Sequence, residues 1–205
     1  MKKIILASKS IDRKKTFKRL NIPFETIITD IDEGYYKELF SNPIELVKEI
    51  AKAKALKAKD LLKNRNMEAI IIAADTIVEF KGKIIGKAKN KAQAFQILKS
   101  LTNRSHNLIT SVAITELNDP KVVVDYDCTI VTFLDISDNE IRNYINTEEW
   151  KGRAGAYSIR DRASLFVQEI RGSPSNVIGL PMQKIFGILK KDFSLNLFDT
   201  YLNSE

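Results

Sequence analysis

Asp75 stands out among the acids of the sequence because it directly follows a continuous apolar stretch, Ile70-Ile-Ile-Ala-Ala74. A carboxylate at the end of such a strand is where α/β proteins place functional acids, in the crevice beyond the sheet. A second acid cluster, Asp30-Ile-Asp-Glu33, follows another strand-like run, and Lys87 follows Ile84-Ile-Gly86. Carboxylates and lysines suit Mg²⁺ bound with a polyphosphate, whereas a single histidine and a single cysteine do not suit zinc. A local role for Asp75, capping a turn, stays open.

Arg13 indicates an anion site or an internal ion pair near the N-terminus. A strand-like run, Lys2 to Ala7, is followed by Ser8-Lys-Ser10 and a helix start. A helix N-terminus offers free N–H groups and a positive dipole end to an anion, although the chain contains no P-loop motif. Arg13 lies four residues before Phe17, on the apolar face of the expected helix. It therefore needs a partner, either a carboxylate or a phosphate.

Lys54 is a similar anomaly in a long helix expected from Pro43 to about Lys63. It lies four residues after Ile50 and so points inward or along the rim, and snorkelling from a packed stem is the alternative explanation. The other lysines of this helix are interpreted as a solvated face: Lys48, Lys52, Lys57, Lys59 and Lys63.

Hydrophobic periodicity and turn signals predict the elements that position these residues. Strands are expected at 2–7, 24–31, 68–75, 107–117, 121–134 and 164–170, with a hairpin over 76–85 that turns at Lys81-Gly82. Helices are expected at 12–20, 43–63, 91–101, 137–144 and 180–189. Helices alternate with strands, but consecutive strands also pair in the middle of the chain. The pattern predicts an α/β protein with a mixed central sheet.

The composition of the sequence indicates which kind of protein this is and what it binds. Hydrophobic residues make up 44% and charged residues 29% of 205 residues, which is ordinary for a globular protein. The net charge of +7 favours a polyanionic partner without distinguishing nucleotide from nucleic acid. Cys128 lies in an apolar run and is expected to be a buried thiol. No apolar stretch reaches the length of a membrane span, and no full signal peptide is present, so a soluble cytoplasmic protein without membrane partners is expected.

Several segments together resemble the Maf proteins, a family of nucleotide pyrophosphatases with the inosine-triphosphatase-like fold. They are Leu6-Ala-Ser-Lys-Ser-Ile-Asp-Arg13, Asp30-Ile-Asp-Glu33, Lys54-Ala55, Ala74-Asp-Thr-Ile-Val78, Ile85-Gly-Lys-Ala88, Asn103-Arg-Ser-His-Asn-Leu-Ile-Thr110, Arg153-Ala-Gly-Ala-Tyr157 and Asn176-Val-Ile-Gly-Leu-Pro181. The resemblance covers nearly the whole chain. It implies one domain over residues 1–205, built as a mixed sheet flanked by helices, with two lobes around a cleft.

The resemblance also implies a reaction, the hydrolysis of a nucleoside triphosphate to the monophosphate and pyrophosphate. By resemblance Asp75 is the catalytic base, Glu33 and Asp75 hold Mg²⁺ or Mn²⁺, and Thr76 lies near the base of the nucleotide. The residues expected to cradle the triphosphate are Ser8, Arg13, Lys54 and Lys87. The Asp-Thr pair resembles the group that acts on dTTP and UTP, and a homodimer is expected.

Two positions depart from the family pattern: Asp12 stands where an arginine implicated in substrate choice is usual, and Arg160 where a glutamine is usual. The hypothesis is that Asp12 and Arg160 pair and jointly reset base recognition. The sequence leaves two rival functional classes. One is a regulatory nucleotide-binding protein linked to septum arrest in cell division, which the intact set of acids and Lys87 argues against. The other is a nucleic-acid-binding module, which no motif supports.

Three conspicuous residues are interpreted as structural. Trp150 is expected to be a packing or dimer-surface aromatic, and His106 to form a structural hydrogen bond. Tyr157 could approach the substrate or belong to the core.

Overall fold

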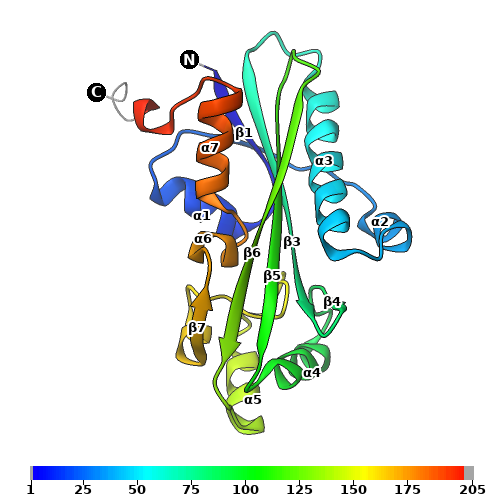
Figure 1. Cartoon of the computed structure of the whole chain (residues 1–205), viewed down its shortest axis with the longest axis vertical. Helices are drawn as coiled ribbons and strands as arrows, with labels where there is room; N and C mark the ends of the chain where they lie inside the picture. Colours follow the sequence, from blue (N-terminus) through cyan, green and yellow to red (C-terminus); the bar gives the residue numbers. More distant parts are fainter. Residues whose placement is uncertain (1, 201–205) are drawn as a thin grey trace. The chain divides into compact units, whose positions relative to one another are not determined.

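The computed structural model describes residues 2–200, and Figure 1 draws its strands as arrows. They are β1 (Lys3–Ala7), β2 (Glu25–Ile27), β3 (Ala69–Phe80), β4 (Lys83–Ile85), β5 (Ser105–Glu116), β6 (Val122–Phe133) and β7 (Val167–Arg171). They form one seven-stranded sheet in the order β2-β1-β3-β5-β6-β7, with β4 paired to β3. The pairs β1–β2 and β1–β3 are parallel, whereas β3–β4 and β6–β7 are antiparallel. The expected mixed α/β sheet is confirmed.

Most helices begin after a residue whose side chain caps them, and the helix that follows Pro181 is an exception. They are α1 (Ile11–Arg19), α2 (Glu33–Leu39), α3 (Pro43–Leu62), α4 (Lys91–Leu101), α5 (Asp138–Asn146), α6 (Pro174–Val177) and α7 (Met182–Asp192), with 3₁₀ turns η1 (Arg162–Leu165) and η2 (Leu197–Thr200). Ser10 caps α1 by accepting from the Arg13 N–H, and Ser137 forms a capping box with Glu140 at α5. Within residues 2–200, no helix is long and apolar enough to cross a membrane.

The chain divides into two compact units. Unit 1 comprises Met1–Asp75, Ser111–Tyr126 and Gly179–Glu205, and unit 2 comprises Thr76–Thr110 and Asp127–Ile178. The boundary falls inside three long strands, β3, β5 and β6, so each of these strands contributes residues to both units.

In unit 1 the sheet is covered on both faces, because successive side chains of a strand point to opposite sides. Ile4 and Leu6 of β1 pack in one apolar cluster with residues of α1 and α7, including Phe17 and Ile185. Alternate residues of the same strands pack in a second cluster against the alanine-rich face of α3, namely Ile5, Ala7, Ile71 and Ala73 with Ala51, Ala55 and Ala58. Small alanine side chains let α3 approach the sheet closely.

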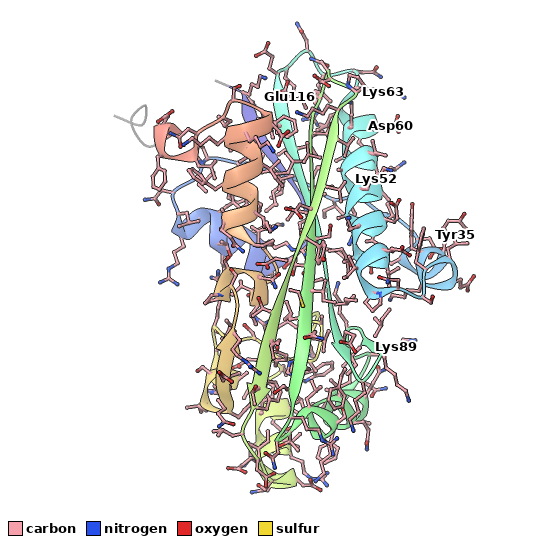
Figure 2. All side chains as sticks on the ribbon, in the orientation of Figure 1. Tyr35, Lys52, Asp60, Lys63, Lys89 and Glu116 are labelled. Atoms are coloured by element: carbon pink, nitrogen blue, oxygen red, sulfur yellow. The ribbon has the colours of Figure 1, made fainter. Side chains whose placement is uncertain are left out.

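The exposed positions of α3 are mostly charged, together with two leucines, Leu56 and Leu61. Lys52, Asp60 and Lys63 are exposed and project from the helix, as Figure 2 shows. Three of the five lysines interpreted as a solvated face, Lys52, Lys57 and Lys63, are exposed, while Lys48 and Lys59 are half-buried. Lys48 lies 5.7 Å from the ring of Tyr126. Lys54 is the lysine of this helix that behaves differently, with 12% of its side chain exposed.

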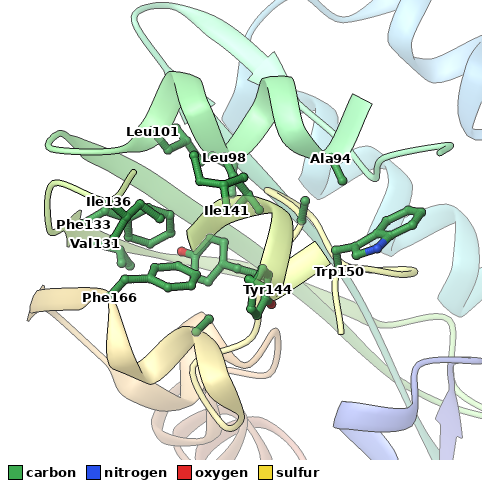
Figure 3. Packing of buried hydrophobic residues seen from close by; sticks show 14 of the residues in the cluster. Ala94, Leu98, Leu101, Val131, Phe133, Ile136, Ile141, Tyr144, Trp150 and Phe166 are labelled. Carbon is green, nitrogen blue, oxygen red and sulfur yellow. The ribbon is translucent and has the colours of Figure 1, made fainter. Parts of the chain in front are cut away.

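Unit 2 has its own core, drawn in Figure 3. Leu98 of α4 and Ile141 of α5 pack over Val131 and Phe133 of β6, and Phe166 closes the cluster. The aromatic rings meet edge to face, as in the Phe133–Phe166 pair at a centroid distance of 5.0 Å, a geometry that the ring quadrupoles favour.

The structure corrects four expectations. Asp75 does not end a strand: β3 continues to Phe80, and Asp75 lies inside it. The strand expected at 24–31 is shorter, since β2 has only three residues. The helix α2, which begins at Glu33, was not expected. Cys128 is exposed rather than buried, because its side of β6 is not covered by the unit 2 core.

Candidate functional site

A lysine that binds two carboxylates forms the centre of the candidate site in unit 1. Lys54 Nζ donates to Asp75 Oδ1 at 2.7 Å and to Glu33 Oε1 at 2.8 Å. The side chains of Lys54 and Asp75 are 12% and 10% exposed, whereas that of Glu33 is 34% exposed. The site therefore has a nearly buried ion pair with a more open carboxylate beside it, and the sequence's three candidates Glu33, Lys54 and Asp75 are in contact.

Three elements bring these groups together. Asp75 belongs to the side of β3 whose residues Ile71 and Ala73 pack against α3, so it points toward the helix that carries Lys54. The neighbouring turns of α3 are anchored by buried alanines, which fixes the direction of the lysine stem. Asp32 caps α2 by accepting from two backbone N–H groups, and this cap places Glu33 in the first helical turn.

Arg13 forms a second buried group, 8% exposed, next to the first. Its Nε donates to the main-chain oxygen of Gly179 at 2.7 Å, and its Nη1 donates to the main-chain oxygen of Ala74 at 2.7 Å and to Ser8 Oγ at 3.3 Å. Because Ala74 directly precedes Asp75, the arginine is tied to the same stretch of β3 as the acid.

Burial lowers the pKa of the Arg13 guanidinium, and the negative charges of Asp75, Glu33 and Asp12 act in the opposite direction. An arginine remains protonated even so. The sequence predicted a carboxylate or a phosphate as the partner of Arg13. The structure adds main-chain carbonyls, those of Gly179 and Ala74, which hold the guanidinium in place.

The remaining predicted residues are dispersed over the two units. Asp12 is half-buried in the first turn of α1. In unit 2, Thr76 is half-buried and its hydroxyl lies 3.0 Å from that of Thr110. Lys87 is exposed and forms a β-bridge with Ala154, and Arg160 is half-buried in a turn. The proposed pairing of Asp12 with Arg160 stays a prediction.

Three residues interpreted as structural lie in the core of unit 2. Trp150 is buried and donates from Nε1 to the main-chain oxygen of Ile145, so its packing role is confirmed. The expected structural hydrogen bond of His106 is present, joining Nε2 to Tyr157 Oη at 2.9 Å. Burial lowers the pKa of His106 to about 4 and raises that of Tyr157. Both are therefore neutral near pH 7.

Four positioning groups were missed by reasoning from side-chain types. Two are the main-chain oxygens of Ala74 and Gly179, which no side-chain pattern can reveal. Gly179 has a φ of 90°, a left-handed conformation that favours glycine. The other two, Thr110 and Asn176, stand in segments that resemble family motifs but had no assigned role.

The carboxylates suit a hard divalent cation. Among residues 2–200, no group of three or more His, Cys, Asp and Glu side chains could hold a metal by itself. Asp75 and Glu33 nevertheless bind one cationic group in common, the Lys54 ammonium. Two carboxylates supplemented by substrate phosphates are a usual set of ligands for Mg²⁺, so the residues present fit such an ion.

Comparisons with known proteins find relatives that match nearly the whole chain. A family model described as "Maf-like protein" matches residues 3–192. The chain is 42% identical over 193 residues to a "dTTP/UTP pyrophosphatase" of Caldanaerobacter subterraneus subsp. tengcongensis, covering 94% of this chain and 90% of the relative. It is 43% identical over 197 residues to a protein of the same name from Alkaliphilus oremlandii, covering 96% of this chain and all of the relative. By the extent of these matches, the chain belongs to the Maf family.

Proposed function

We propose that this protein is a nucleoside triphosphate pyrophosphatase that acts on pyrimidine nucleotides such as dTTP and UTP, or on modified forms of them. The observation that carries the proposal is the contact of Lys54 with both Asp75 and Glu33, beside the buried Arg13. Acids and fixed cations in one place are what the attack of water on a phosphate requires. The names of the relatives support the same reaction and the same substrates.

In this proposal water attacks phosphorus in line with the leaving pyrophosphate. Asp75 orients the water and accepts its proton, and Lys54 keeps the Asp75 carboxylate turned toward that position. Ser8, Arg13 and Lys87 bind the triphosphate together with Lys54. The positive charges of Arg13, Lys54 and Lys87 offset the negative charge that gathers on the phosphate oxygens as the bond breaks.

A divalent ion, Mg²⁺ or Mn²⁺, is part of the proposal, held by Glu33 and Asp75. When bound, it supplies further neutralisation of phosphate charge. The two carboxylates already converge on a single cation, the ammonium of Lys54, and this convergence supports their assignment.

Thr76 is proposed to lie near the base, and the pyrimidine preference rests on it and on the relatives. Asp12 and Arg160 are proposed to modify that preference. We also propose that the two units act as one domain, since the family match spans both, and that the enzyme is a cytoplasmic homodimer without nucleic-acid or membrane partners.

A panel of ordinary and modified nucleoside triphosphates, assayed with Mg²⁺ or Mn²⁺ for release of pyrophosphate, tests the proposal. We expect UTP and dTTP to give the highest kcat/KM and to yield a monophosphate and pyrophosphate in equal amounts. Tight nucleotide binding without turnover would instead support a regulatory protein connected with septum arrest, an alternative that the relatives' names do not favour.

A further inference from the structure

Two threonine hydroxyls and one carbonyl form a short chain of hydrogen bonds within unit 2. Thr76 Oγ1 lies 3.0 Å from Thr110 Oγ1, and Thr110 Oγ1 donates to the main-chain oxygen of Asn176 at 3.2 Å. Thr110 is fully buried, whereas Thr76 is half-buried and so within reach of a ligand. These hydrogen bonds therefore connect the protein interior to Thr76, which the proposed function places near the base of the nucleotide.

The order of these hydrogen bonds fixes which threonine hydroxyl donates its hydrogen to the other. A threonine hydroxyl has one hydrogen and two acceptor positions, and a carbonyl oxygen can only accept. The hydrogen of Thr110 is used by the Asn176 oxygen. Both contacts can form together only if Thr76 donates its own hydrogen to Thr110. The hydroxyl hydrogen of Thr76 thus points to Thr110. The Thr76 oxygen can then act toward a ligand only as a hydrogen-bond acceptor.

Asn176 is a firm anchor for this arrangement. Its side chain is fully buried, and Nδ2 donates to the main-chain oxygen of Leu108 at 3.1 Å and to Thr129 Oγ1 at 2.9 Å. Leu108 belongs to the same strand as Thr110, so one residue holds two points of β5. The Asn176 carbonyl also accepts from the Ile178 N–H. The donor-to-acceptor direction of these hydrogen bonds is therefore set by the packed interior and not by solvent.

We infer that Thr110 and Asn176 are positioning residues for base selection, which hold the Thr76 hydroxyl as an acceptor for the N3–H group of uracil or thymine. The inference rests on the proposed function. In a nucleotide, uracil and thymine carry one ring N–H, at N3, and it matches an acceptor. Cytosine has a bare acceptor nitrogen at N3, so two acceptors would face each other and one would lose its hydrogen bond.

The test is the ratio of kcat/KM for UTP to that for CTP. Thr110→Val removes the acceptor for the Thr76 hydrogen, which can then turn toward the N3 of cytosine. We expect the ratio to fall about tenfold, the value of one hydrogen bond between neutral groups. Thr110→Ser keeps the hydroxyl and should restore the ratio. In a Thr76→Val background, Thr110→Val should have no further effect on the ratio, because the oriented hydroxyl is gone.

Thr115→Val is the matched control, because Thr115 is also a fully buried threonine of β5 and donates to a main-chain oxygen, that of Lys121, at 2.7 Å. It should change the melting temperature but not the ratio. Thr110→Ala gives the same comparison if Thr110→Val does not fold. A ratio within twofold of the wild type in a folded Thr110 variant lacking the hydroxyl overturns the inference while the proposed function stands. Absence of pyrophosphate release from every nucleotide by the wild type overturns both.

Discussion

Lys54 should be coupled much more strongly to Asp75 than to Glu33, although the two hydrogen bonds differ by only 0.1 Å in length. At 2.7 Å, Coulomb's law with an effective dielectric constant of about 20 gives a gross attraction of about 6 kcal/mol, most of which offsets the loss of hydration. For the pair with Asp75, whose side chain is 10% exposed, we expect a net coupling of about 2–3 kcal/mol. The side chain of Glu33 is 34% exposed, so solvent screening should reduce the net coupling of Lys54 with Glu33 to about 0.5–1 kcal/mol.

Two double-mutant cycles measure these values by urea denaturation, one with Lys54→Met and Asp75→Asn, the other with Lys54→Met and Glu33→Gln. Methionine keeps the length of the lysine stem, so packing against the alanines of α3 is retained. The Lys54→Met variant alone should lose about 3 kcal/mol, because the Asp75 carboxylate stays buried without its cation. A Glu33 coupling equal to or larger than the Asp75 coupling would refute this prediction, as would two couplings below about 0.5 kcal/mol.

Three further predictions concern His106, Gly155, and the pair Asp12 and Arg160. The pKa of His106 is about 4 in the folded protein, against an ordinary value of 6.5, so the unfolded state takes up a proton first as the pH falls. The free energy of unfolding should therefore decrease by about 3 kcal/mol between pH 6.5 and pH 4. This pH dependence should flatten in His106→Gln, and equal slopes for the two proteins would contradict the prediction. Gly155→Ala should destabilise by about 2–4 kcal/mol, since φ is +69° and the added Cβ would lie 2.8 Å from Val78 Cγ2; a melting temperature unchanged from the wild type would be inconsistent with that geometry. Asp12→Arg and Arg160→Gln should have non-additive effects on relative kcat/KM across the nucleotide panel, and strict additivity would remove the proposed pairing.

Much of the fold could be predicted because its signals are local. The start of α3 is marked by Asn42 and Pro43, and that of α5 by the Ser137–Glu140 capping box, both of which are short-range patterns. The helix α2 could not be predicted in this way. None of its seven residues is buried, so its sequence shows no hydrophobic periodicity of the helical kind.

The position of Asp75 could not be predicted, because a charge after an apolar run looks like the end of a strand. In the structure the strand continues through it, and the cost of burying the carboxylate is offset by Lys54, which lies 21 residues away in the sequence. Residue types identified Glu33, Lys54 and Arg13 as candidates. They could not reveal that carbonyl oxygens hold Arg13, because every residue has one and only the fold selects which are used.

The central claim is that Asp75 is the catalytic base, and Asp75→Asn tests it most directly. The amide keeps the shape of the side chain but is not basic, so pyrophosphate release from UTP should fall at least a hundredfold. Binding of a non-hydrolysable α,β-methylene analogue of UTP, measured by titration calorimetry, should change less than tenfold. Asp125→Asn, which removes a unit 1 ion pair with Lys184 at 2.9 Å, serves as the control and should keep wild-type turnover. Turnover of Asp75→Asn near that of the wild type would contradict the account.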